Sequence, residues 1–238
     1  MRRKLIVGLA ILLALAVGDA QADRRKLVWT YQYGTMASGS TEMEFYQTVA
    51  QQNQDKWEYR IELEHGLTAN TDLAVYEIFS QTEGSSLRWD AVQVRLRTRL
   101  AEQGELPLDP LLYIEYARKA SPAHDNKAEL KLVLSHDFSR TLFALNPVFE
   151  GVFGPEHSPE YEVGLDLGLA QELSYTWSLG VEMTGRREFL AGPDETSTYL
   201  GPTASYASGE MFLALGYGWG ISEASDPAKL RAILGVGL

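Results

Sequence analysis

Hydrophobic and polar residues alternate along most of the chain, and the segment 56–64 shows the pattern most clearly. Aromatic and aliphatic residues occupy every second position, namely Trp57, Tyr59, Ile61 and Leu63. The positions between them are all ionic: Glu58, Arg60, Glu62 and Glu64. Because successive side chains of a β-strand point to opposite faces, this pattern predicts a strand with one apolar face and one charged face.

The same alternation recurs in segments of roughly ten residues separated by turns or loops, a length that suits a tilted membrane-spanning strand. We predict twelve strands, at 41–50, 56–66, 71–81, 87–99, 109–119, 127–136, 141–150, 160–171, 176–187, 196–206, 210–220 and 229–238. An even number is what single-chain bacterial outer-membrane barrels have. No apolar run after Val17 approaches the roughly 18 residues that would predict a transmembrane helix.

Such an alternating sheet has two interpretations. In a soluble β-sandwich the apolar face would form the core and the charged face would contact water. In a membrane barrel the apolar face contacts lipid and the charged face lines the lumen. Long strands, hairpin-only connections and a leucine-rich last strand reaching Leu238 favour the membrane barrel. We therefore predict an all-β fold, a transmembrane antiparallel up-and-down β-barrel of about 12 strands.

The first 22 residues have the parts of a secretory signal peptide. Basic residues at 2–4 precede an apolar stretch at 5–17, and Ala20-Gln21-Ala22 is a small-x-small cleavage site. The segment LVWTYQY at 27–33 resembles a strand, but we assign it to a separate N-terminal part. The predicted organisation is a signal peptide at 1–22, a periplasmic or lumenal segment at 23–40 and the barrel at 41–238.

Charge and composition narrow the classes of partner. The chain carries a formal net charge of −11, and cleavage removes three basic side chains and one acidic side chain, which leaves −13. So acidic a chain argues against nucleic acid as a partner. It has no cysteine, which excludes disulfides and thiolate metal sites. No calcium-loop spacing and no phosphate-binding loop are present, so we expect neither a metal nor a cofactor.

Two stretches add a resemblance to a known class of protein. GSTEMEFYQT at 39–48 and the hairpin EHGLTANTDLAVY at 64–76 are similar to an uncharacterised group of small outer-membrane β-barrel proteins of diderm bacteria. The resemblance covers most of the chain after residue 22, and it implies a porin-like or transporter-like barrel. The chain ends in Leu238, whereas the terminal strand of many such proteins ends in an aromatic residue.

In the predicted barrel the charged face turns inward. Its acidic members are Glu42, Glu44, Glu58, Glu62, Glu64, Glu77, Glu115, Glu129, Glu150, Glu162, Asp166 and Glu182. Its basic members are Arg60, Arg95, Arg97, Arg99, Lys131, Arg186 and Arg231. Two functions fit this face: a polar channel whose acidic bias favours cations or neutral polar solutes, or a salt-bridged interior that closes the barrel. We predict a passive channel for small polar solutes or ions, with a plugged structural or surface barrel as the alternative.

The apolar face carries aromatic residues toward the strand ends: Trp57, Tyr59, Tyr161, Trp177, Tyr206, Tyr217 and Trp219. Aromatic girdles at both membrane interfaces are typical of outer-membrane barrels. We therefore expect a monomer in the cell outer membrane that contacts outer-membrane lipid and is inserted by the barrel-assembly machinery.

A barrel-embedded hydrolase is the weakest of the alternatives. His124-Asp125 and His157-Ser158 fall in predicted outer loops, and His65 and His136 fall at turns of the opposite end. General base catalysis needs a histidine within hydrogen-bond reach of a nucleophile and an acid that orients it. None of these residues has a recognisable catalytic spacing, so we predict that the protein is not an enzyme.

Overall fold

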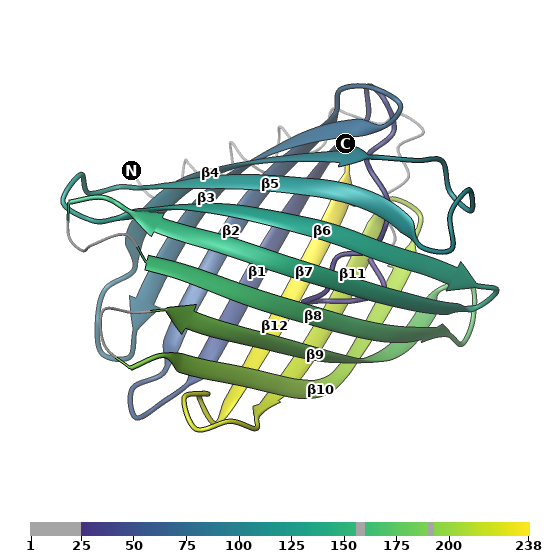
Figure 1. Ribbon diagram of the computed structural model, residues 1–238. Helices are drawn as coiled ribbons and strands as arrows, with labels where there is room; N and C mark the ends of the chain where they lie inside the picture. Colours follow the sequence, from purple (N-terminus) through teal and green to yellow (C-terminus); the bar gives the residue numbers. More distant parts are fainter. Residues whose placement is uncertain (1–24, 156–159, 190–192) are drawn as a thin grey trace, which may run out of the picture.

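The computed structural model describes residues 25–155, 160–189 and 193–238, which form one closed β-barrel (Figure 1). Its strands are β1 (Thr41–Gln51), β2 (Lys56–Gly66), β3 (Thr71–Thr82), β4 (Arg88–Arg99), β5 (Asp109–Lys119), β6 (Asn126–Phe138), β7 (Thr141–Phe153), β8 (Glu160–Glu172), β9 (Trp177–Phe189), β10 (Glu195–Ser208), β11 (Met211–Gly220) and β12 (Ala228–Gly237). None of the described residues forms a helix long and apolar enough to cross a membrane. The predicted signal peptide lies outside the described residues.

Each strand pairs antiparallel with its neighbours in sequence, and β12 pairs with β1 to close the sheet. The prediction of a twelve-stranded antiparallel barrel is confirmed. The predicted and observed strands differ only at their ends. The largest extension is in β7, where Gly151 and Val152 remain paired with Tyr161 and Glu160 beyond the predicted end at residue 150.

The two faces of the sheet have opposite chemistry. Aliphatic side chains such as Leu63 and Leu179 lie on the outside of the barrel, where they are 47% and 48% exposed in the isolated chain. The neighbouring residues in sequence point inward, and Glu62 and Arg95 are almost completely buried. Polar and charged side chains therefore occupy the interior, which is the reverse of a soluble β-sandwich.

Aromatic side chains on the outer face gather toward both ends of the barrel. At the end that carries the 221–227 connection, the rings of Tyr217 and Trp219 lie 5.1 Å apart. At the opposite end, the rings of Trp177 and Tyr206 lie 5.0 Å apart. Aromatic pairs thus lie on the outer surface at both ends, where interface girdles would be; that these residues form such girdles stays a prediction.

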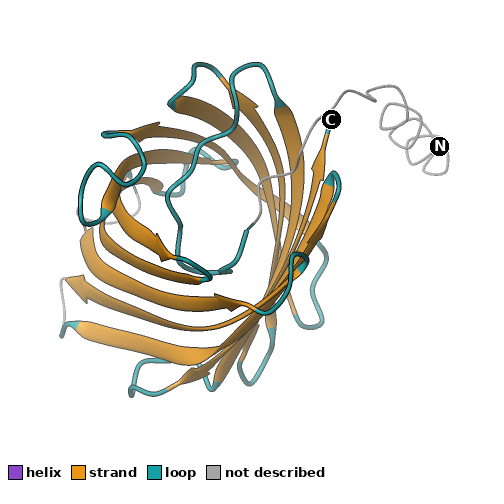
Figure 2. Ribbon diagram, turned by 90° about the vertical axis from the view of Figure 1, so that its right-hand side faces the viewer, coloured by secondary structure: helices purple, strands orange, loops and turns teal. Residues whose placement is uncertain are grey.

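The first described residues pass through the interior of the barrel (Figure 2). Leu27 and Val28 are fully buried there, and the described residues that precede β1 form no strand. The chain leaves the lumen along β2, where the amide of Gly39 donates to the carbonyl of Gly66 at 2.8 Å. We call residues 25–36 the lumenal segment.

Candidate functional site

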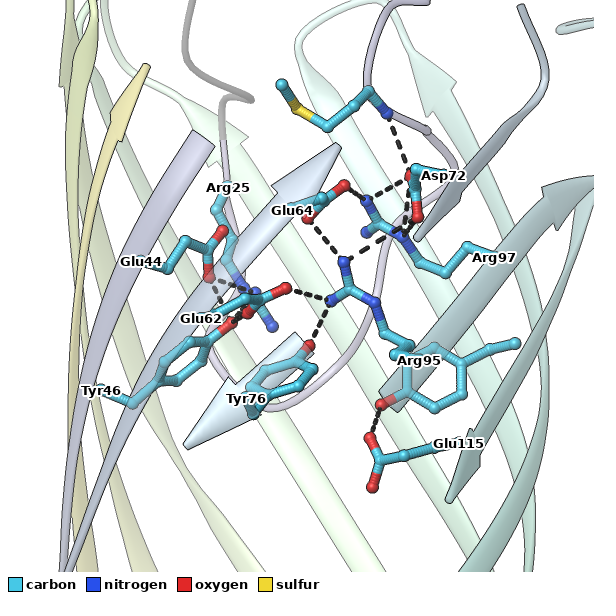
Figure 3. Close-up of polar contacts among 12 residues, drawn as sticks. Arg25, Glu44, Tyr46, Glu62, Glu64, Asp72, Tyr76, Arg95, Arg97 and Glu115 are labelled. Atoms are coloured by element: carbon cyan, nitrogen blue, oxygen red, sulfur yellow. Dashed lines mark hydrogen bonds and ion pairs between the residues drawn. The ribbon is translucent and has the colours of Figure 1, made fainter. Parts of the chain in front are cut away.

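Two arginines of β4 form an ionic network with β2 and β3 inside the barrel (Figure 3). Arg95 contacts the carboxylates of Glu62 at 2.9 Å and Glu64 at 2.5 Å. Arg97 contacts Asp72 at 2.7 Å and also binds Glu64. All five side chains are nearly inaccessible to solvent. Buried charges of this kind are tolerated when each is paired and hydrogen-bonded.

The same network reaches β1 and the lumenal segment. The guanidinium of Arg25 lies 3.0 Å from the Tyr46 hydroxyl and 3.3 Å from Glu44. Tyr46 also donates to Glu62 at 2.7 Å, while Arg95 donates to the hydroxyl of Tyr76 at 2.6 Å. Four neighbouring strands, β1 to β4, and the lumenal segment are thereby joined through charged and tyrosine side chains.

Glu182 of β9 holds the lumenal segment through the backbone. Its carboxylate accepts hydrogen bonds from three successive amides, those of Val28 at 2.7 Å, Trp29 at 2.8 Å and Thr30 at 2.7 Å. On β7, Asn146 accepts from the amide of Tyr31 at 2.6 Å and donates to its carbonyl at 3.0 Å. These contacts satisfy backbone groups that would otherwise be buried without partners.

Lys26 links the lumenal segment to the ends of β6 and β8. Lys26 contacts Asp137 at 2.6 Å and Glu172 at 2.9 Å. Burial opposes the charged form of Lys26, but hydrogen bonds and attraction from these two carboxylates outweigh it and raise the pKa of the amine. The lumenal segment is therefore held at several points along its length.

Glycines on the inner face make room for the lumenal segment. A Cβ atom at Gly168 would lie 2.5 Å from a methyl group of Leu27. A Cβ atom at Gly216 would lie 2.9 Å from the Cβ of Val28 and 3.0 Å from the indole nitrogen of Trp29. The close approach of Leu27 and Val28 to the wall thus depends on the missing side chains.

A row of glutamates crosses six strands of the opposite wall. Each member is the direct cross-strand partner of the next: Glu115, Glu129, Glu150, Glu162, Glu188 and Glu195. Three of them have cationic partners, since Lys131 contacts Glu129 at 3.1 Å, Lys127 contacts Glu150 at 2.6 Å and Arg186 contacts Glu162 at 3.2 Å. Like charges placed directly opposite each other repel, so the row favours cations beside it. We call it the glutamate row.

Two cavities lie along this row. The inner cavity, about 310 Å³ in volume, is lined by five acidic and five basic side chains: Glu58, Asp90, Glu115, Glu129 and Glu150, with Arg60, Lys119, Lys127, Lys131 and Arg231. The outer cavity, about 470 Å³ in volume, is lined by six acidic side chains, three basic ones and one histidine: Asp90, Asp125, Glu150, Glu160, Glu162 and Glu188, with Arg88, Lys119, Lys127 and His124. Beside the lumenal segment, a cavity of only about 10 Å³ is lined by Arg25, Tyr31, Glu44 and Arg97 among others. The acidic excess therefore belongs to the outer cavity.

The residues singled out from the sequence fall into three groups. Glu62, Glu64, Arg95 and Arg97 form the ionic network. Glu58, Arg60, Glu115, Glu129, Lys131 and Arg231 line the inner cavity, and Glu162 lines the outer one. Asp166 pairs with Arg186 at 2.5 Å, Glu182 binds the lumenal segment, and Arg99 lies at the strand end, where it binds the carbonyl of Ala69.

One inward assignment is wrong. Glu77 lies on the outer face, where it accepts a hydrogen bond from the indole of Trp89 at 2.7 Å. The alternation of β3 places Asp72, Ala74, Tyr76 and Ile78 inward instead, and all four are buried. Glu77 was predicted to face the lumen because it is acidic. The two-residue period of β3 instead puts it on the outer face, opposite to Tyr76 and Ile78.

Several important residues were missed for a related reason. Asp72 completes the ionic network, and Tyr46, Tyr76 and Asn146 bind its members or the lumenal segment. The alternation of β3 could have identified Asp72 and Tyr76. The role of Asn146 depends on the path of the lumenal segment, which no periodic pattern indicates.

The described histidines lie at both ends of the barrel. His124 and Asp125 line the outer cavity as neighbours in sequence, whereas His157-Ser158 lies outside the described residues. At the other end, His65 is 2.9 Å from the Thr41 hydroxyl, and His136 is 3.4 Å from Asp109. Within the described part of the chain, no group of three or more histidine, aspartate or glutamate side chains is placed to hold a metal ion.

Comparison with known proteins relates the chain to others through its fold. No protein-family model matches it, and no curated protein matches its sequence. Among solved structures, it is similar to the COG4313 outer membrane channel from Pseudomonas putida F1, with a TM-score of 0.64 and 11% identity over 89% of this chain and 100% of that one. The NanC porin matches with a TM-score of 0.57 and 10% identity over 82% of this chain and 98% of that one.

The chain has the fold of a small outer-membrane β-barrel. The likeness extends over nearly the whole length of both solved structures. At these identities it establishes the fold of the barrel and leaves its activity to be argued from the lumen.

Proposed function

We propose that this protein is an outer-membrane channel through which small polar solutes pass passively, with a preference for cations at the outer entrance. The main support is the outer cavity, in which acidic side chains outnumber basic ones two to one. Rings of acidic side chains attract cations in channel entrances, and a low-dielectric wall strengthens the effect. The glutamate row continues this acidic surface toward the inner cavity.

Single-channel recording of the refolded protein in planar bilayers tests this proposal. With a salt gradient across the bilayer, the reversal potential should show cation preference. Neutralising two members of the glutamate row that line the outer cavity, in the double variant Glu162→Gln and Glu188→Gln, should move it toward the anion side. Glu77→Gln is the matched control because this carboxylate lies on the outer face. A silent protein, or equal shifts in both variants, would contradict the proposal.

The contacts of the lumenal segment favour a second candidate function. Glu182 and Asn146 of the wall hold the segment across the interior, and Arg25 of the segment contacts Glu44 of the wall. The cavity beside these contacts has a volume of only about 10 Å³. A barrel closed in this way would have a structural or surface role without transport. Removing residues 25–36 separates the candidates: a conducting full-length protein supports the channel, whereas conduction only after the removal supports the closed barrel.

The membrane location belongs to the same proposal. We place the protein in the cell outer membrane as a monomer, with its aliphatic band against lipid and with insertion by the barrel-assembly machinery. Fractionation of cells should recover it with outer membranes, and its gel migration should change on heating, as folded barrels are resistant to detergent. Recovery in the soluble periplasmic fraction would contradict this placement.

A further inference from the structure

Most of the charges that line the inner cavity are already paired. Four of its five cations contact a carboxylate of the same cavity: Arg60 contacts Glu58 at 2.7 Å, Lys119 contacts Asp90 at 2.8 Å, Lys127 contacts Glu150 at 2.6 Å and Lys131 contacts Glu129 at 3.1 Å. The remaining cation is Arg231, and the remaining carboxylate is Glu115. Neither forms an ion pair with a described residue.

Arg231 of β12 is fixed in place although no carboxylate of the described residues lies within ion-pair distance of it; Glu58 attracts it from farther away. Its Nε donates to the Thr48 hydroxyl at 2.8 Å, and its guanidinium carbon lies 4.3 Å from the ring centroid of Trp29. No described residue accepts a hydrogen bond from its two terminal nitrogens, and these atoms are not sealed from solvent. They are therefore available to a molecule in the inner cavity, in the planar arrangement that binds a carboxylate through two hydrogen bonds.

Glu115 of β5 lies on the other side of the same cavity. In the closed ring, β5 and β12 are separated by strands on both sides, so the two side chains approach the cavity from roughly opposite walls. The Tyr113 hydroxyl donates to one carboxylate oxygen of Glu115 and holds the group in position. Among the described residues no cation lies within ion-pair distance of this carboxylate, although Arg60 and Lys131 attract it from farther away, and an ammonium group would supply a direct contact.

We propose that the inner cavity binds a small zwitterionic solute, with its carboxylate on Arg231 and its ammonium group on Glu115. This inference rests on the proposed function in one respect: the solute must be able to enter the lumen through the outer cavity. The paired side chains of the cavity offer little to a molecule with a single charge. A solute with both charges satisfies the two unpaired groups at once, and its length must match their separation.

Calorimetric titration of the detergent-purified full chain tests the proposal. The probes are glycine, 4-aminobutyrate and 6-aminohexanoate, which differ in the distance between their charges, with acetate and butylammonium as molecules of one charge. One of the zwitterions should bind at least about tenfold more tightly than either singly charged probe, as expected for gaining a second charged hydrogen-bonded contact. Equal binding of zwitterions and singly charged probes, or no binding by any zwitterion, would overturn the proposal.

Variants identify the two ends of the site. Arg231→Gln and Glu115→Gln should each weaken zwitterion binding by at least about tenfold, and Arg231→Lys should fall between these variants and the original chain because it keeps the charge without the planar fork. The double variant R187Q/D194N removes an exposed ion pair that lies outside the cavity and should change the affinity by less than about threefold. Heat-modifiable gel migration checks that each variant is folded. Unchanged affinity in folded Arg231→Gln would refute the assignment.

The outcome is separable from that of the channel proposal. A protein that binds the zwitterion but stays silent in bilayers keeps this site and loses the channel function. A protein that conducts, but binds no zwitterion more tightly than acetate or butylammonium, keeps the channel function and loses this site.

Discussion

At the scale of single residues, burial decides what each charge contributes. Arg95 bridges Glu62 and Glu64 with almost no access to solvent, whereas Arg187 and Asp194 form a pair at 3.0 Å that is largely exposed. Desolvation makes a broken buried pair costly because the remaining partner is left as an uncompensated charge. An exposed pair is screened by water and contributes little.

We predict that Arg95→Met destabilises the folded barrel by about 3–5 kcal/mol, since it leaves the buried carboxylate of Glu62 without its cation and removes one of the two arginines that contact Glu64. The measurement is the free energy of unfolding in urea, with the protein in lipid vesicles. Arg187→Met serves as the control and should change this free energy by about 0–1 kcal/mol. Similar effects of the two substitutions would show that the network does not stabilise the wall.

The sequence pointed to most residues of the ionic network, but not to all of their contacts. Glu62, Glu64, Arg95 and Arg97 were placed together because strict alternation fixes the face of each strand, and neighbouring hairpins bring those faces side by side. On β3, Glu77 was assigned to the lumen because it is acidic and not because of its place in the two-residue period. Asp72, which the period places inward, was therefore missed. The pairing of Glu182 with three backbone amides could not be predicted because it depends on a segment without periodicity.

At the scale of structural elements, two tight turns illustrate the local rules. Gly209 has a φ of 59° and Ser139 has a φ of 64°, so both lie in the left-handed region that hairpin turns require. Glycine adopts this conformation without a steric penalty, whereas serine does not. The turn at Ser139 is therefore less favourable than the turn at Gly209.

We expect Ser139→Gly to stabilise the barrel by about 0.5–1 kcal/mol because it removes the clash of Cβ at positive φ. Gly209→Ala should have the opposite sign, since it introduces that clash. Both effects are read as shifts of the urea midpoint of unfolding in vesicles. Destabilisation by Ser139→Gly would indicate that the serine side chain has a favourable role at this turn.

The lumenal segment depends on the wall that receives it. Gly216→Val should push Val28 and Trp29 away, because the added side chain occupies their position. We predict a larger single-channel conductance than that of the original chain, together with faster protease cleavage within residues 25–36. Gly151→Val is the control, because Gly151 faces outward with only the Tyr161 ring nearby. Unchanged conductance and cleavage in Gly216→Val would show that the segment does not obstruct the lumen.

At the scale of the whole molecule, the number of strands and their antiparallel order followed from the sequence, because period-two alternation and short connections leave few alternatives for consecutive hairpins. Whether the apolar face meets lipid or forms a core could not be settled from alternation alone. In the structure β12 pairs with β1, which turns the apolar face outward and leaves the interior to charged residues and the lumenal segment. The position of this segment and the division of the lumen into two cavities required the three-dimensional arrangement.

The most direct measurement is quenching of site-specific fluorophores by nitroxide-labelled lipids in vesicles. The chain contains no cysteine, so a single cysteine can be introduced and labelled at each position. Val94 and Gln93 are neighbours on β4, with Val94 41% exposed on the outside and Gln93 2% exposed on the inside. We predict strong quenching of a label at Val94→Cys and weak quenching at Gln93→Cys. Weak quenching at Val94→Cys, with a protein that stays folded in buffer without detergent, would contradict the placement of the apolar face against lipid.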